Sequence, residues 1–224
     1  ETMRDRQIVK AALAATTTAD ARGLQEMVAA AIGARHQRFL GDTTNNHGLM
    51  GSGGSFDLKV IELVTNMQDA LIERRAIARY GSDGDIPFAS PREAAESLFA
   101  GDPESALADM VAVEFRESDP PTRGSKRITA VFRDAGCGLA PAQVCETIFR
   151  LGSSHKGRAL YLQGAFGLGG TTTYRNAEAI VLVSRRAPEL LRDGEEDRIL
   201  VAVVQWERHM KGQGAYYLVT NPWA

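Results

Sequence analysis

The stretch IELVTNMQDA, residues 61–70, combines a helical pattern with three polar residues, Glu62, Asn66 and Asp69. Asn is a poor helix former because its side chain competes for backbone hydrogen bonds, so a solvated face would favour lysine or glutamate here. The amide oxygen of Asn66 can instead serve as a ligand for Mg²⁺, which takes oxygen ligands. The Glu62 carboxylate, one turn earlier, can accept a proton from a water that attacks a phosphate. The pair therefore indicates metal-assisted phosphate chemistry.

Helical geometry places the polar residues of this segment on one side. At about 100° of rotation per residue, a stripe about 60° wide holds Glu62, Asn66, Asp69 and Glu73. The opposite side is apolar and holds Val60, Val64, Met67 and Leu71. Two interpretations stay open at this point: the stripe faces water, as on most amphipathic helices, or it faces a ligand.

A turn-forming segment, FRDAGCGLAP, follows a strand-like run and places Asp134 ahead of Gly136 and Gly138. Asp-x-Gly sequences commonly form tight turns, which is the simpler interpretation. In the functional interpretation, the two glycines let a planar ligand approach the backbone. Asp134 then accepts a hydrogen bond from an exocyclic amine of that ligand.

A second glycine-rich segment is LQGAFGLGGTTTY, which contains Gly164, Gly167, Gly169 and Gly170. It is either a flexible loop or a loop leading into a helix whose amides face phosphates. The two common nucleotide-binding loops do not fit. No clear strand precedes Gly167, as the Rossmann loop requires, and no Gly-Lys-Ser/Thr triplet occurs, as the Walker loop requires.

The elements that would position these segments follow from hydrophobic periodicity and turn residues. Helices are expected at 4–40, with 20–40 as the clearer half and Asp20 as its N-cap, at about 57–80, within 91–100, and at 139–151. Strands are expected at 109–117, 126–134, 178–186, 198–208 and 215–221. Helices followed by hairpin-connected strands predict an α+β fold, a two-layer α/β sandwich with one mixed, mostly antiparallel sheet and helices on one face.

Composition narrows the classes of protein. The 224 residues carry a net charge of −2, so bulk electrostatics favour neither nucleic acid nor a membrane. With only two cysteines, Cys137 and Cys145, we expect a reduced, cytoplasmic protein without a disulfide framework. No apolar run of membrane-spanning length and no signal-peptide core occur. Since the chain begins at Glu1, we expect part of a longer protein, with a helical arm at 1–45 and a domain at 46–224 truncated at its C-terminus.

Taken together and in order, these segments resemble the GHKL ATPases, the superfamily of gyrase, the heat-shock chaperone, histidine kinases and MutL. The helix motif Glu-x-x-x-Asn-x-x-Asp-Ala is matched by Glu62, Asn66, Asp69 and Ala70. The motifs Asp-x-Gly-x-Gly and Gly-x-x-Gly-x-Gly are matched by Asp134, Gly136, Gly138, Gly164, Gly167 and Gly169. The resemblance implies the Bergerat fold, and the first motif is similar to that of the hydrolysing branch: type II topoisomerases, MutL, MORC and the heat-shock chaperone.

The resemblance also implies a role for each matching residue. Asn66 would hold Mg²⁺ against the triphosphate of ATP, Glu62 would be the general base, and Asp69 would lie near the nucleotide and its waters. Asp134 would accept the adenine amino group. Gly136 and Gly138 would give room for the base. The mobile lid around the phosphates would be formed by four glycines, Gly164, Gly167, Gly169 and Gly170.

Two further positions are less specific. In the lid, LGSSHK offers Ser153, Ser154 and Lys156 as additional phosphate contacts, with a solvated loop lysine as the equal alternative for Lys156. The fourth element of the family, a Thr near a late strand, has Thr220 as its one candidate.

The resemblance leaves two functions of different classes. In the first, the chain is an ATPase module whose nucleotide state drives lid closure and dimerisation in a larger machine, with DNA or protein as client. In the second, it is a nucleotide-gated binding or scaffold module with little or no turnover. The second-domain lysine that reaches the γ-phosphate in several relatives has no place in 224 residues, so the chain is expected to bind ATP well and to hydrolyse it slowly or not at all. A kinase would need a phosphoacceptor helix, and His36 lacks the usual acidic neighbour.

Overall fold

The computed structural model of the chain describes residues 3–43, 46, 55–82, 84–99, 101–118, 127–150, 159–163, 177–209 and 212–220. The α-helices are α1 (Met3–Ala14), α2 (Thr18–Ile32), α4 (Phe56–Tyr80), α5 (Pro91–Leu98), α6 (Pro103–Ala108) and α7 (Pro141–Val144). Short 3-10 helices span η1 (Ala34–His36), η2 (Leu40–Asp42) and η3 (Pro188–Leu190). The strands are β1 (Arg38–Phe39), β2 (Val111–Glu117), β3 (Ile128–Asp134), β4 (Ala179–Arg185), β5 (Ile199–His209) and β6 (Gly212–Val219).

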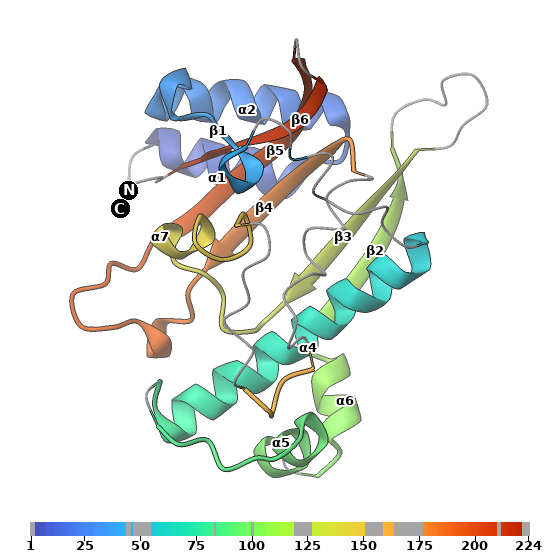
Figure 1. Ribbon diagram of the computed structural model, residues 1–224, viewed down its shortest axis with the longest axis vertical. Coiled ribbons are helices and arrows are strands. Elements are labelled where there is room, and N and C mark those ends of the chain that lie inside the picture. Colours follow the sequence, from blue (N-terminus) through green and yellow to red (C-terminus); the bar gives the residue numbers. More distant parts are fainter. Residues whose placement is uncertain are drawn as a thin grey trace.

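This content confirms the α+β class, and each strand expected from the sequence is present (Figure 1). In the part of the chain that the structure describes, no helix is both long and apolar enough to cross a membrane.

The helix that carries the first motif, α4, has nearly the bounds that the sequence predicted. It ends at Tyr80, and its C-cap is Gly81, whose φ of 84° is accessible to glycine and whose amide donates to the Ile77 carbonyl at 2.8 Å. Met67 and Leu71 of the predicted apolar side are buried. They anchor α4, which packs on β2 and β3 and against α5.

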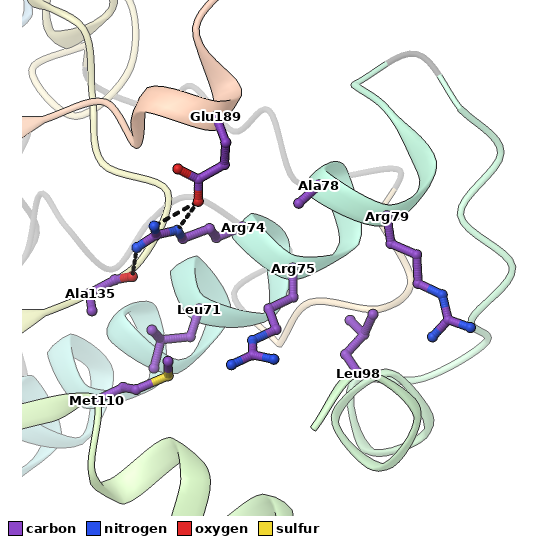
Figure 2. Close-up of a pocket in the computed structure, with 9 residues that line it drawn as sticks. All are labelled: Leu71, Arg74, Arg75, Ala78, Arg79, Leu98, Met110, Ala135 and Glu189. Atoms are coloured by element: carbon purple, nitrogen blue, oxygen red, sulfur yellow. Dashed lines mark hydrogen bonds and ion pairs between the residues drawn. The ribbon is translucent and has the colours of Figure 1, made fainter. Parts of the chain in front are cut away.

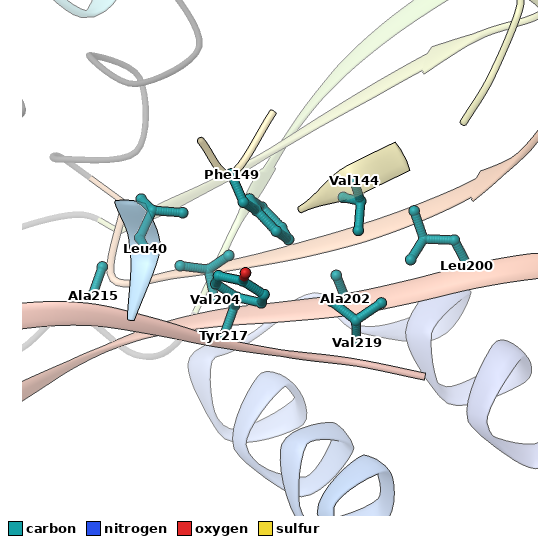
Figure 3. Packing of buried hydrophobic residues seen from close by; sticks show 9 residues of the cluster. All are labelled: Leu40, Val144, Phe149, Leu200, Ala202, Val204, Ala215, Tyr217 and Val219. Carbon is teal, nitrogen blue, oxygen red and sulfur yellow. The ribbon is translucent and has the colours of Figure 1, made fainter. Parts of the chain in front are cut away.

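The larger sheet has the strand order β1-β6-β5-β4 with antiparallel pairing throughout. Residues 200–204 of β5 are each at most 1% exposed, so this central strand is covered on both faces. One face packs in a cluster of Leu40, Val144, Phe149, Leu200, Ala202, Val204, Ala215, Tyr217 and Val219 (Figure 3). The other face packs on α1 and α2 in a cluster that includes Ile8, Ala12, Leu24, Val28, Val201, Val203 and Leu218. The helices of the N-terminal segment therefore lie on the sheet of their own chain.

The strands form two sheets where the sequence predicted one. β2 and β3 pair antiparallel as a separate two-stranded sheet. This sheet adjoins the larger one along β3 and β4 (Figure 1). At one end, Arg127 forms an ion pair of 3.2 Å with Glu178, and at the other the amide of Ala187 donates to the Cys137 carbonyl at 3.0 Å. β3 and β4 therefore run side by side in the same direction, and helices cover both faces of the larger sheet rather than one.

The N-cap of α2 differs from the predicted one by three residues. Thr17 is the N-cap, and Asp20 is the partner three residues later in a reciprocal capping box. The Asp20 amide donates to Thr17 Oγ1 at 3.1 Å, and Asp20 Oδ2 accepts from the amides of Thr16 and Thr17 at 2.9 and 3.0 Å. These bonds, that from the Thr16 amide first, hold the pKa of Asp20 below its usual value.

The helix predicted at 139–151 is also shorter than expected. Pro141 lies in the first turn as predicted, yet α7 spans only Pro141–Val144 and tight turns follow. Phe149 is 2% exposed and its ring lies 4.5 Å from that of Tyr217, centroid to centroid. Burial of this ring against the sheet takes precedence over continuation of the helix.

Candidate functional site

The polar stripe of α4 is not simply a solvated helix face. Asp69 is fully buried, while Glu62, Asn66 and Glu73 are half-buried. A buried carboxylate requires hydrogen-bond donors, because desolvation without them costs several kcal/mol or more, on the order of the largest single-residue effects. Asp69 Oδ1 accepts a hydrogen bond from the backbone amide of Gln163 at 2.8 Å.

The donor residue, Gln163, links this bond to the third motif. It immediately precedes Gly164, the first residue of the third motif. The bond between Asp69 and Gln163 thus fixes the start of the second glycine-rich segment to α4, 94 residues away in sequence. Sequence reasoning did not select Gln163, because a backbone donor leaves no signal in the side-chain pattern.

The second motif is also hydrogen-bonded to α4, at Ala70, the residue that follows Asp69. Asp134 Oδ1 accepts from the Gly136 amide at 2.9 Å, which confirms the tight-turn interpretation of Asp-x-Gly. The next amide, that of Cys137, donates to the Ala70 carbonyl at 3.0 Å. A Cβ on Gly136 would lie 2.5 Å from the Cβ of Ala70, so only glycine fits this approach.

Whereas Gly136 lies close to α4, Gly138 lies close to the end of β4. Its φ is 60°, in the left-handed region that favours glycine, and a Cβ here would overlap the carbonyl oxygen of Arg185 at the end of β4. The Gly138 carbonyl accepts from Arg186 Nη1 at 3.2 Å. Both glycines therefore make room for protein neighbours, and the role predicted for them beside a planar base stays a prediction.

Burial raises the pKa of three side chains in this region, Asp134, Cys137 and Tyr161. Although Asp134 keeps an exposed surface, desolvation by the surrounding protein raises the pKa of its carboxyl above the usual value, against the lowering effect of the Gly136 amide. Desolvation, and next the charge of Glu73, raise the pKa of the Cys137 thiol to about 12. The same two causes, in the same order, raise the pKa of Tyr161 to about 12. The surroundings of Cys137 therefore favour the protonated thiol over the thiolate.

Along the stripe, Asn66 lies about one turn before Asp69, and Glu62 lies about two turns before it. In the part of the chain that the structure describes, their side chains form no hydrogen bond or ion pair with other side chains or with the backbone. Neither side chain is therefore committed to a partner among the described residues. Among the described residues, no group of three or more His, Cys, Asp or Glu side chains is placed to hold a metal ion.

The remaining predicted positions have separate outcomes. Several lie outside the described residues, namely Ser153, Ser154, Lys156, Gly164, Gly167, Gly169 and Gly170. Thr220 is described, and it extends the pairing of β6 with β5: its Oγ1 accepts from the Val201 amide at 3.0 Å, and its own amide donates to the Val201 carbonyl at 2.9 Å.

A groove of about 500 Å³ lies beside α4, and Figure 2 shows the residues that line it. Leu71, Arg75 and Ala78 contribute to it from α4. At about 100° per residue, these three lie about 160–220° around the helix from Glu62. The groove is therefore a second surface, distinct from the one that carries the motif residues.

In comparisons with known proteins, no family model, no curated protein and no solved structure matches this chain.

Proposed function

We propose that the chain is the ATP-binding domain of a GHKL-type ATPase, which binds ATP with Mg²⁺ and hydrolyses it. The observation that supports this most is the convergence of the motif segments on one helix. Asp69 bonds to Gln163 at the start of the third motif, and Ala70 bonds to Cys137 inside the second. Segments far apart in the sequence thus meet at the polar stripe, where a nucleotide would require them together.

Each described residue has a task in this proposal. Glu62 accepts the proton of the attacking water, since its carboxylate makes no competing bond within the described part of the chain. Asp134 accepts the adenine amino group on the oxygen not committed to Gly136. Asp69, already bonded to Gln163, holds the start of the lid and positions waters near the nucleotide.

The donor set suits the metal. Mg²⁺ takes oxygen ligands and is usually held by few protein groups together with substrate phosphates. Asn66 offers an amide oxygen on the same side of α4 as Glu62, with Cβ atoms about 5–6 Å apart as for any pair four residues apart. Mg²⁺, when bound, would neutralise phosphate charge. The lid candidates Ser153, Ser154, Lys156, Gly164, Gly167, Gly169 and Gly170 would complete the phosphate site.

In the full-length protein, this domain would be cytoplasmic and would act as a homodimer whose contacts depend on bound ATP. Its client would be DNA or protein, which contact domains other than this one. The alternative is a nucleotide-gated binding module with little or no turnover, and the experiment below separates the two.

The test measures ATP binding by calorimetry, with Mg²⁺ and with EDTA, and phosphate release in parallel. Glu62→Ala should keep ATP binding and lose about 10²–10⁴-fold in turnover, the usual contribution of a general base. Asn66→Ala should lose the Mg²⁺-dependent part of the affinity. Glu26→Ala, at an exposed position of α2, is the matched control and should behave as wild type.

Each failure has its own meaning. A wild-type chain that does not bind ATP rules out the proposed function altogether. ATP binding without phosphate release supports the binding-module alternative. Equal phosphate release by wild type and Glu62→Ala rules out the general-base assignment alone.

A further inference from the structure

The groove beside α4 combines apolar walls with excess positive charge. Its apolar lining includes Leu71, Leu98 and Met110. Its charged lining consists of Arg74, Arg75, Arg79 and Glu189, so three positive charges and one negative leave a net charge of +2. The whole chain has a net charge of −2, which makes this groove a local exception. Such a surface attracts a negatively charged ligand.

The three arginines differ in what they contact. Arg74 is committed to the protein: its Nε donates to Glu189 Oε1 at 2.6 Å and its Nη1 to the Ala135 carbonyl at 2.7 Å. Arg75 instead lies over the ring of Phe99, with 4.7 Å from Cζ to the centroid. Arg74 therefore belongs to the wall of the groove, and Arg75 keeps its guanidinium donors for another group.

Arg79 resembles Arg75 in this respect. It bonds to the carbonyl of Ser97 at 3.5 Å and lies over the ring of Tyr80 at 5.4 Å from Cζ to the centroid. Neither Arg75 nor Arg79 is paired with a carboxylate within the described residues, and both are exposed. Aromatic rings hold the two groups in position without neutralising them. Figure 2 shows both side chains extending from α4 with Leu98 between them.

The spacing defines the ligand further. Arg75 and Arg79 are four residues apart on α4, so their Cβ atoms lie about 5–6 Å apart. A partner helix with two carboxylates one turn apart has the same spacing, and each guanidinium fork can bind one carboxylate with two parallel hydrogen bonds. Between the arginines lies Leu98, which is 8% exposed, and its remaining surface, together with the exposed Ala78 and the half-buried Met110, suits an apolar side chain of that partner. A nucleic acid strand would use the charges but not the apolar walls.

We infer that this groove is a docking site for an acidic amphipathic peptide segment of a partner protein, held by Arg75 and Arg79 and by apolar contacts with Leu98. Beneath these contacts, the half-buried Met110 and the buried Leu71 form the apolar floor of the groove, on which a leucine of the peptide packs. The inference is independent of ATP binding, because none of these side chains belongs to the polar stripe.

The test uses the whole chain without nucleotide and a fluorescein-labelled helical peptide of about fifteen residues, with two glutamates one turn apart and leucines beside them. Fluorescence anisotropy should show saturable binding that salt weakens. Arg75→Gln combined with Arg79→Gln should weaken binding at least about tenfold, the factor that corresponds to about 1.4 kcal/mol. Arg22→Gln, at an exposed position of α2, is the matched control and should leave the affinity unchanged.

Two further variants separate charge from shape. Ala78→Trp at the exposed Ala78 places a large side chain in the groove and should abolish binding while all three arginines remain. Arg75→Glu combined with Arg79→Glu should prefer a peptide in which lysines replace the two glutamates. Circular dichroism of each variant shows that it is folded.

Three outcomes would overturn the inference. One is no binding of the acidic peptide by wild type. Another is equal binding when serines replace the leucines of the peptide, since the apolar walls would then be irrelevant. The third is tighter binding of an oligothymidine strand of matched charge, which would make the groove a nucleic-acid surface instead.

Discussion

Gly136→Ala is the sharpest test of the way α4 and the second motif fit together. The added Cβ would lie 2.5 Å from the Ala70 Cβ, 2.7 Å from Asp134 Oδ1 and 2.8 Å from the Ala70 carbonyl carbon. Two of these three atoms belong to Ala70 and cannot rotate away, because one is backbone and the other is bonded directly to Cα. Relief to an ordinary contact of about 3.4 Å or more requires the segment to move by about 1 Å.

The expected loss of stability follows from two opposed terms. Overpacking of this kind costs about 1–3 kcal/mol. Replacing glycine by alanine also restricts the unfolded chain, which stabilises the folded state by about 0.4–1 kcal/mol. We therefore expect a net loss of about 1–2 kcal/mol in the free energy of unfolding. A shift of about 1 Å would also break the bond of 3.0 Å from the Cys137 amide to the Ala70 carbonyl and move Asp134.

Urea denaturation followed by circular dichroism measures the free energy of unfolding, and calorimetry measures ATP affinity. Gly23→Ala is the control: Gly23 lies within α2, and a Cβ there meets nothing within 4 Å. The same chemical change should stabilise the protein there by about 0.5–1 kcal/mol. A Gly136→Ala variant as stable as Gly23→Ala, with unchanged ATP affinity, would refute the close approach of the second motif to α4.

Three further predictions concern stability. Gly138→Ala should destabilise by about 3 kcal/mol or more, since the position combines a positive φ with overlap on the Arg185 carbonyl; a thermal midpoint within a degree or two of wild type would contradict it. Asp20→Ala should cost about 1 kcal/mol at neutral pH through loss of the capping box. Because hydrogen bonds lower the pKa of Asp20, its contribution is present above the unfolded-state pKa and is lost as the pH falls through the folded-state pKa; denaturation at pH values on both sides should show the difference from wild type vanish in acid. Asn46→Ala should cost about 3 kcal/mol, since the fully buried Asn46 side chain bonds to both the amide and the carbonyl of Ala215; a loss below about 0.5 kcal/mol in urea denaturation would contradict its role.

The sequence predicted those elements whose signals are local. α4 has an apolar side, a polar stripe and a terminal glycine, and each expected strand has its run of β-branched and apolar residues. The division into two sheets has no local signal, because it depends on whether β3 and β4 form a ladder. The role of Asn46 could not be predicted either, because it lies in a polar, glycine-rich stretch. Only the structure shows that its side chain bonds to the backbone of Ala215 and so continues the pairing at the edge of β6.

The sequence singled out Asp69 and Gly136 by residue type and spacing, and their roles beside a nucleotide stay predictions. The structure shows that both make contacts between distant segments. What could not be predicted is the partner at each position. Ala70 occupies the space beside Gly136, and a backbone amide donates to the Asp69 carboxylate. Neither an alanine nor a backbone amide is conspicuous in the sequence.

The turn at residues 134–137 also connects the two proposed ligand surfaces. It is bonded to α4 at Ala70 beside the polar stripe, and at Arg74, which holds the Ala135 carbonyl at the wall of the groove. A displaced turn should therefore weaken both ATP binding and peptide binding in Gly136→Ala. The double Arg75→Gln, Arg79→Gln variant should lose the peptide alone, and Glu62→Ala should lose turnover alone. If Gly136→Ala weakened only one of the two ligands, the turn would not be the shared support that its bonds to α4 indicate.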